Sequence, residues 1–313
     1  MKRLPGLLRL IGFLLFGLIL YAVEPTKVWN LLKTLKLTWL CIALLGLFPM
    51  MLFKAWRWQI LLKMQGISFS LPEAFRIYFG TAFLGNVTPG RAGDFLRVFY
   101  VADKGGVSLA KGFASVLMDR ICDVLVLFLL GFSGYFLYTF SIKTLVPIVV
   151  VFLLFVLLML MLFNQSFSKP LLRWIFKRSF LNLVKDKAEI AFNDFFKGME
   201  SFKGMKLCLP FLFSFLSYVF FFQISYFLAL ALSLNSTLPY LIFCITLVNI
   251  VSTLPVTILG FGTREGALLL LFERVGLSSL QAVSYSMLFF VTFMVVGGIW
   301  GGWYWWKYPV KIK

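Results

Sequence analysis

Residues 145–163 read LVPIVVVFLLFVLLMLMLF, an uninterrupted apolar run without a charged side chain. A helix needs about 20 predominantly apolar residues to cross the hydrocarbon core of a bilayer. The rest of the chain has a matching composition, because 61% of its 313 residues are hydrophobic and 13% are charged. Soluble domains average about 45–50% apolar and about 25% charged residues. We therefore expect an all-α polytopic membrane protein that forms one transmembrane domain over residues 1–313.

Five more apolar segments are predicted to cross the membrane, which gives about six full spans. They are Leu4–Val23, Leu37–Phe53, Ile121–Ile142, Leu207–Leu232 and a last span within Val275–Trp306. The first segment follows Lys2 and Arg3 without a small-residue cleavage site, so we interpret it as an uncleaved span. Residues 164–206 combine many basic and aromatic side chains. This pattern predicts a cytoplasmic amphipathic segment on the membrane surface.

Two further apolar segments are interrupted before they can cross. Residues 77–90 form a run of only 14 residues that ends in Asn-Val-Thr-Pro-Gly and meets charges, and residues 238–262 are interrupted by Asn249, Pro255 and glycines. Broken backbone at membrane depth is tolerated only within protein or beside a water-filled cavity. We therefore expect two re-entrant hairpins made of broken helices.

The basic segments fix the expected orientation, because Lys and Arg are concentrated on the cytoplasmic side. Both termini and the loops 54–76 and 164–206 are then cytoplasmic. This requires residues 77–104 to return to the cytoplasmic side and residues 238–276 to return to the outer side. Hairpins that enter from opposite faces are typical of transporters built from inverted repeats.

A weak internal repeat agrees with that arrangement. Each half has a proline, a glycine, an arginine and an acid in order, followed by a Gly-apolar-Ser turn. The turns are Gly106-Val107-Ser108 and Gly276-Leu277-Ser278. Two Gly-, Pro- and Arg-rich loops that look alike by chance remain the alternative.

The overall charge argues against several classes of protein. The chain has 30 Lys and Arg against 12 Asp and Glu, and it has no histidine. The missing histidine removes Ser–His–Asp triads, His-based acid–base catalysis and most zinc sites. Basic loops between apolar spans indicate contact with anionic lipid headgroups, so we expect no nucleic-acid partner. We also expect no cofactor and no resident metal.

Three clusters of polar residues could bind a substrate. The first contains Asn86, Pro89, Gly90, Arg91, Gly93, Asp94 and Arg97. The second contains Asp119, Arg120 and Asp123. The third contains Pro255, Gly260, Gly262, Arg264 and Glu265. Glycines let backbone N–H groups approach an anion, and the arginine fork suits a phosphate.

Each cluster also has a purely structural interpretation. The first and third could be loop caps with an Arg–acid pair. In the second, Asp119 and Asp123 lie one helical turn apart, and Asp123 lies in an apolar run where it needs a partner. We expect Arg91 or Arg97 to be that partner.

These motifs resemble those of the lysylphosphatidylglycerol synthase transmembrane-region family, also called the flippase-like domain family. Residues 86–97 match a pattern N-x-x-P-x-R-x-G-[DE]-x-x-R, residues 119–123 match [DE]-R-x-x-D, and residues 255–265 match P-x-x-x-G-x-G-x-R-E. The resemblance implies a flippase-like membrane module. In the family's best-known members this module moves aminoacylated phosphatidylglycerol between leaflets, and a soluble aminoacyl-transferase domain follows it. No such domain is expected here, so the family's lysyltransferase label is not expected to describe this chain.

The expected function is a flippase or transporter for lipids with a charged phospho- or aminoacyl headgroup, acting in a bacterial or archaeal cytoplasmic membrane. Anionic or aminoacylated lipids are the expected partners, and the sequence leaves the oligomeric state open. One alternative is an intramembrane enzyme that modifies a lipid headgroup, with carboxylates that could include a metal site at Asp119, Asp123 and Glu265. The other alternative is a non-catalytic partner of a lipid- or glycan-modifying complex.

Overall fold

The computed structural model describes residues 14–138, 185–253 and 260–307, with short pieces between residues 146 and 170. All regular structure in these ranges is helical, and residues 14–22 form the first described helical turns. The further helices are α2 (Pro25–Lys33), α3 (Leu37–Met64), α4 (Leu71–Val87), η1 (Pro89–Leu96), α5 (Arg97–Gly105), α6 (Leu109–Tyr138), α9 (Lys185–Glu200), η3 (Gly204–Leu207), α10 (Cys208–Ala231), α11 (Leu238–Thr253), α12 (Thr263–Glu273), α13 (Ser279–Phe290), η4 (Val291–Val296) and α14 (Gly297–Lys307). Parts of the predicted span at 145–163, residues 164–169 and 171–184 of the predicted amphipathic segment, and Pro255 lie outside the described residues.

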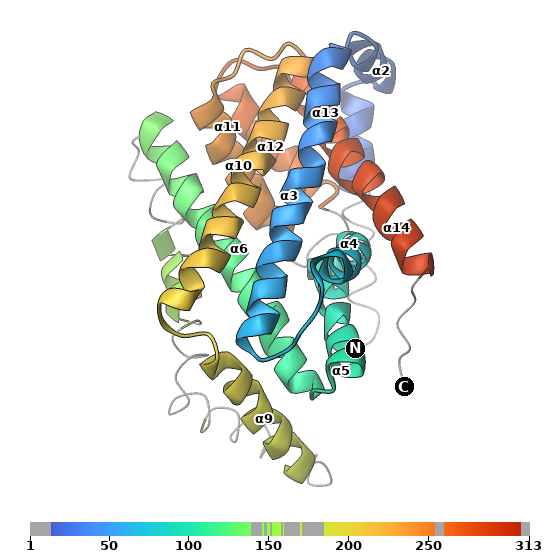
Figure 1. Ribbon diagram of the computed structural model, residues 1–313. Helices are drawn as coiled ribbons and strands as arrows, with labels where there is room; N and C mark the ends of the chain where they lie inside the picture. Colours follow the sequence, from blue (N-terminus) through green and yellow to red (C-terminus); the bar gives the residue numbers. More distant parts are fainter. Residues whose placement is uncertain are drawn as a thin grey trace.

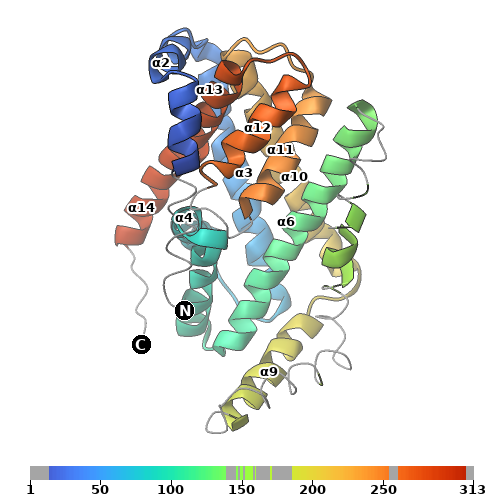
Figure 2. The same cartoon turned by 180° about the vertical axis from the view of Figure 1, so that it is seen from behind.

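Three long helices form the frame of the molecule. Helices α3 and α10 pack side by side along its length, and α6 crosses behind them (Figure 1). Helices α11, α12 and α13 gather toward one end of α3, and α5 and α9 lie toward the other end (Figures 1 and 2). Among the described residues, Leu37–Met64 and Gly204–Ala231 are long and apolar enough to cross a membrane.

The two apolar helices are not covered by the rest of the chain. Only 11% of the most apolar stretch of Leu37–Met64 is buried, and 39% of that of Gly204–Ala231. Large apolar side chains also face outward elsewhere, such as Leu45 on α3, Leu129 on α6 and Ile299 on α14. A water-soluble protein would bury such helices, whereas lipid tails solvate them. The expected all-helical membrane protein is therefore confirmed at this level.

Helix boundaries differ from the sequence-based expectation in two places. Helix α3 continues past Phe53 to Met64, so Lys54 and Arg57 lie in the helix and not in a loop. Helix α6 is one continuous helix of 30 residues, so it begins 12 residues before the predicted span at Ile121. Ser108 caps this helix, because its Oγ accepts a hydrogen bond from the N–H of Lys111 at 3.3 Å.

The described part of the segment 164–206 packs against the helical frame. Phe196 and Met199 of α9, together with Phe202 after it, are buried, and α9 contacts α6. The opposite face of α9 carries exposed residues such as Ile190. Helix α9 is therefore amphipathic, and its buried face covers α6.

The chain leaves α3 and α10 through turns of the same construction. Gly66 and Ser233 have positive φ angles of 76° and 55°. The next residue in each turn, Ile67 or Leu234, donates its N–H to a carbonyl five residues earlier at 2.9 Å. Both turns lead to a Leu-Pro pair that begins the next helix.

A second pair of turns also corresponds. Gly106 follows α5 and Gly276 follows α12, and their φ angles are 60° and 74°. Ser108 and Ser278 then cap α6 and α13 through the N–H three residues later. The same order of elements therefore occurs twice along the chain. It consists of a long helix, a shorter helix, a break, a short helix and a long helical run.

Helix packing follows the same correspondence. Helix α4 packs against α14, and its counterpart α11 packs against α6. Glycines allow the first contact to be close, since a Cβ on Gly301 would lie 2.7 Å from the carbonyl oxygen of Phe79. On the other side, a Cβ on Gly134 of α6 would lie 2.8 Å from the carbonyl oxygen of Pro239. Small residues are the usual means by which membrane helices approach closely.

Candidate functional site

The first polar cluster lies where the chain breaks after α4. Helix α4 ends at Val87, and residues 89–96 form a 3-10 helix that folds back on it. A Cβ on Gly93 would lie 2.3 Å from the carbonyl carbon of Leu84, and a Cβ on Gly85 would lie 2.6 Å from Cγ of Asp94. Because backbone meets backbone here, only glycine fits at position 93. The fold-back carries Asp94 and Arg97 into the helical frame.

Asp119 is the centre of a buried ion network and is fully buried on α6. Its Oδ1 lies 2.6 Å from Nη2 of Arg57 on α3, and its Oδ2 accepts a hydrogen bond from Nη1 of Arg97 at 3.0 Å. Nη2 of Arg120 lies 3.2 Å from the same Oδ2. Three arginines from three helices therefore converge on one carboxylate.

Asp123, one turn along α6, pairs with two of these arginines, Arg57 and Arg120. Its Oδ1 lies 2.5 Å from Nη1 of Arg57 and 3.6 Å from Nζ of Lys54. The same Nη1 of Arg57 donates to Oγ of Ser214 on α10 at 2.7 Å. Of the two arginines expected to pair with Asp123, Arg97 pairs with Asp119 instead. The side chain of Arg91 lies outside the described residues, so its pairing with Asp123 stays a prediction.

Arg120 links this pair of carboxylates to the fold-back. Its Nη1 lies 3.3 Å from Oδ2 of Asp94, and its Nη2 donates to Oη of Tyr78 at 3.0 Å. The guanidinium of Arg97 lies over the ring of Tyr78, 4.3 Å from the centroid. Tyr78 on α4 therefore contacts both arginines.

The buried ion network is defined by four cations and three carboxylates. The cations are Lys54, Arg57, Arg97 and Arg120, and the carboxylates are Asp94, Asp119 and Asp123. Among the described residues it thus has one more positive than negative group. Taking a charge out of water costs several kcal/mol unless it is paired. The extra positive charge of the network therefore needs a counter-charge or has a functional role.

The third motif forms a separate structure at the start of α12. Gly262 has a φ of 78°, and its N–H donates to Oε2 of Glu265 at 2.7 Å. Oε1 of Glu265 accepts from Nη2 of Arg264 at 2.7 Å and from Oγ of Ser286 at 2.6 Å. Glu265 therefore caps its own helix and neutralises the neighbouring arginine. Two phenylalanine rings, Phe261 and Phe290, enclose the guanidinium of Arg264.

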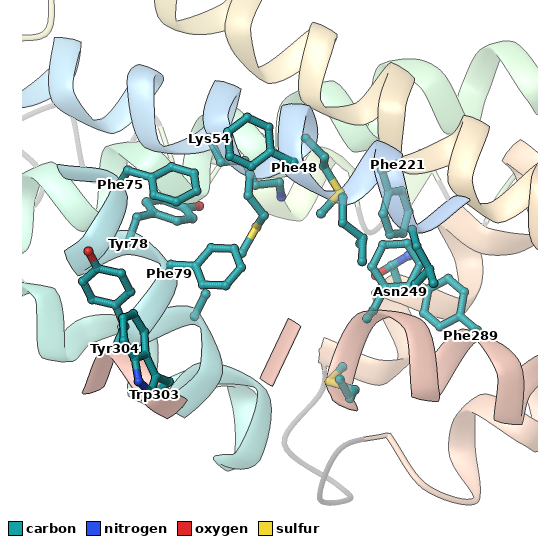
Figure 3. A pocket seen from close by; sticks show the side chains of 17 residues that line it. Phe48, Lys54, Phe75, Tyr78, Phe79, Phe221, Asn249, Phe289, Trp303 and Tyr304 are labelled. Carbon is teal, nitrogen blue, oxygen red and sulfur yellow. The ribbon is translucent and has the colours of Figure 1, made fainter. Parts of the chain in front are cut away.

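A central cavity of about 500 Å³ lies beside the network. Its wall comes from α3, α4, α10, α11, α13, η4 and α14 and is mostly aromatic and aliphatic (Figure 3). Its hydroxyl, amide and amino groups come from Lys54, Tyr78, Asn249 and Tyr304. Lys54 belongs to the buried ion network and Tyr78 contacts it, so the apolar wall of the cavity carries a cationic group.

The structure brings together five of the predicted site residues in the network. They are Asp94, Arg97, Asp119, Arg120 and Asp123. Gly260, Gly262, Arg264 and Glu265 form the α12 cap, a separate structure in which Glu265 pairs with Arg264. The backbone of Asn86, Pro89, Gly90 and Arg91 is described at the break, but their side chains are not.

Sequence reasoning missed Lys54, Arg57 and Tyr78. Lys54 and Arg57 lie three residues apart and therefore face one side of a helix. Asp119 and Asp123 have the complementary spacing of four. This match between two charged pairs is the signal that could have found them, but a loop had been expected at residues 54–76.

Comparison with known families identifies the family of the chain. Residues 7–301 match the family model described as the lysylphosphatidylglycerol synthase TM region. The chain belongs to this family. The resemblance expected from the three motifs is thereby confirmed, and the family is one of membrane proteins.

Relatives of this family member include archaeal proteins. A UPF0104 membrane protein of Methanocaldococcus jannaschii is 23% identical over 74% of this chain and 73% of its own length. A second protein of the same name and organism is 25% identical over 67% of this chain and 84% of its own length. A UPF0104 membrane protein of Pyrococcus horikoshii is 26% identical over 90% of both chains. These relatives support a membrane location.

Proposed function

We propose that the protein is a lipid transporter that moves a lipid with a phosphate-bearing headgroup between the two leaflets. The observation that carries this proposal is the central cavity, whose apolar wall meets the cationic ion network at Lys54 and Tyr78. A lipid has the same division, with an apolar tail joined to a charged headgroup. Membrane-embedded charges that face a cavity usually mark a pathway for a substrate.

The charge of the network favours an anionic group. Its excess positive charge would be balanced by a headgroup phosphate near Lys54. Nη2 of Arg97 and Nε of Arg120 are buried and donate to no acceptor within the described part of the chain. Arginine and lysine are the side chains that bind phosphate oxygens in proteins.

The repeated helix order supports a transport mechanism. We propose that the α4–α5 and α11–α12 breaks are re-entrant from opposite faces, as in transporters with inverted repeats. The remaining long segments would give about six full spans. Both termini would be cytoplasmic, in the cytoplasmic membrane of a bacterium or an archaeon. In this arrangement the cavity lies between the two halves, where relative rocking would expose it to each leaflet in turn.

The network is better suited to binding than to catalysis. Every carboxylate in it is paired with an arginine, and the described residues contain no group of three His, Cys, Asp or Glu residues that could hold a metal. We therefore propose transport over headgroup chemistry. Lipids are its proposed partners.

The test is lipid movement in liposomes that contain the purified chain. Headgroup-labelled anionic lipids are followed with a membrane-impermeant quencher, and wild type is compared with Lys54→Met and Lys63→Met. Lys63 lies on the same helix and is exposed, so its replacement is the matched control. We expect wild type and Lys63→Met to move lipid and Lys54→Met to be slower by about tenfold, as a loss of about 1.4 kcal/mol produces.

Two results would contradict the proposal. Wild-type vesicles that move lipid no faster than empty vesicles would remove transport and favour a partner-protein role. Equal rates of lipid movement for Lys54→Met and wild type would show that transport does not depend on Lys54 in the central cavity.

A further inference from the structure

A second cavity of about 570 Å³ opens between the first turns of α4, helix α5 and the end of α14. Its charged residues are Glu73, Arg76, Asp103, Lys104 and Lys307. Its aromatic residues are Tyr100, Tyr304 and Trp305. We name it the α4–α14 cleft. It shares no charged residue with the buried ion network.

The balance of charge in the α4–α14 cleft is positive. Three cations stand against two carboxylates, and one cation, Lys104, is 2.6 Å from Oε1 of Glu73. The side chain of Lys104 is 53% exposed, so this ion pair is weak and can exchange. Arg76 and Lys307 lie on opposite walls, on α4 and α14. An anionic group in the cleft would therefore be held from both sides.

The aromatic side chains place the cleft at the membrane surface. The rings of Tyr100 and Trp305 meet edge to face with centroids 6.4 Å apart. Nζ of Lys307 lies over the ring of Trp303, 5.1 Å from its centroid. Tyr and Trp beside Lys at the end of a membrane helix are typical of the headgroup level.

One residue connects this cleft with the central cavity. Tyr304 lines both cavities. It comes from α14, which is held against α4 by the close contact of Gly301 with Phe79. Tyr304 therefore stands between the charged α4–α14 cleft and the apolar cavity that Lys54 lines.

We propose that the α4–α14 cleft is the loading site for the phosphate of an anionic lipid headgroup, which then passes Tyr304 into the central cavity. Passage of the headgroup into the central cavity rests on the proposed transport function, whereas binding in the α4–α14 cleft does not. A lipid phosphate fits better than a free phosphate, because the cleft joins an apolar cavity that can take the attached tail. Arg76, Lys104 and Lys307 would bind the phosphate, and Tyr304 would separate the two positions of the headgroup.

Binding is tested on the full chain in phosphatidylcholine nanodiscs. Energy transfer from tryptophan to headgroup-dansylated phosphatidylethanolamine, an anionic phosphodiester, is measured against the mole fraction of the labelled lipid. For Arg76→Gln/Lys307→Gln the half-saturating fraction should rise roughly fivefold for each charge removed, from the usual attraction of a basic residue to anionic lipid. Lys36→Gln/Lys203→Gln removes the same charge from exposed positions outside the cleft and should leave binding unchanged.

The outcomes separate the possible ligands. Displacement by unlabelled anionic lipid and not by millimolar inorganic phosphate supports a lipid site. Displacement by inorganic phosphate alone, or an equal shift in both double variants, overturns the proposal. An unchanged thermal unfolding midpoint for each variant shows that binding and not folding was altered.

The same variants also distinguish loading from transport. In liposomes, Arg76→Gln/Lys307→Gln should raise the lipid fraction that gives half the maximal rate and leave the maximal rate unchanged. If wild type binds lipid as described but moves none, the transport proposal fails and the binding site remains. If wild type moves lipid and the cleft variants do so with wild-type saturation, the loading site is wrong.

Discussion

At the scale of single residues, the protein holds charged side chains in a buried network inside its helical frame. Asp119 is fully buried, and it is the point at which arginines from α3, α5 and α6 meet. An isolated charge in this position would be strongly unfavourable, so the network persists because each member has a counter-charge. Lys54, which completes the network at the cavity wall, is the member best placed to meet a substrate.

Replacing Asp119 by asparagine should destabilise the protein. The change keeps the shape of the side chain but leaves the buried arginines Arg57 and Arg97 without a shared counter-charge. Breaking a buried ion pair costs about 3–5 kcal/mol. The measurement is the unfolding free energy in mixed micelles.

Glu73→Gln is the matched control for this prediction. It removes a carboxylate from a partly exposed pair with Lys104, which is worth about 0–1 kcal/mol. Equal losses of unfolding free energy for Asp119→Asn and Glu73→Gln would contradict the description of Asp119 as the buried counter-charge of the network.

At the scale of helices, the sequence predicted the breaks better than the lengths. The polar and glycine-rich residues that follow Phe83 predict the end of α4. A membrane helix cannot continue through Pro89 and its charged neighbours without loss of hydrogen bonds. The length of α3 was not predictable in the same way. Lys54 and Arg57 look like the end of a span, and only the carboxylates on α6 allow the helix to continue within the protein.

Two glycines in α14 give a matched test of how α4 and α14 pack. A Cβ on Gly301 would lie 2.7 Å from both the carbonyl oxygen of Phe79 and Cβ of Phe83, whereas a Cβ on Gly302 would lie 3.4 Å from the ring of Phe83. We expect Gly301→Ala to push the helices apart, at a cost of about 1–3 kcal/mol from overpacking, and to slow lipid movement. Gly302→Ala should behave as wild type in unfolding and in transport. The same behaviour for both variants would mean that close packing of these helices is not required.

At the scale of the whole molecule, the two halves share a framework but differ in chemistry. Counted from the capping residues Ser108 and Ser278, the positions of Asp119, Arg120 and Asp123 correspond to Phe289, Phe290 and Phe293. One half therefore supplies a polar network and the other an aromatic surface. Phe289 and Phe293 line the central cavity, as Lys54 does.

The composition and the three motifs were enough to predict a helical membrane protein of this family. They also named five members of the ion network as candidate site residues, although in two separate clusters. They left open whether Glu265 caps a loop beside Arg264 or binds a substrate, because a capping carboxylate and a substrate-binding carboxylate have the same sequence pattern. The central cavity arises from the packing of seven helices and the α4–α14 cleft from that of three, which no local pattern encodes.

The most direct test of the account is a cryo-electron microscopy map of the protein in nanodiscs that contain an anionic phospholipid. The account predicts density for a headgroup phosphate within hydrogen-bonding or ion-pair reach of Nζ of Lys54, about 4 Å or less, with a tail along the aromatic wall of the central cavity. The same density should be lost in Lys54→Met. A cavity closed by side chains, or lipid tails in it with every headgroup remote from Lys54, would contradict the central claim.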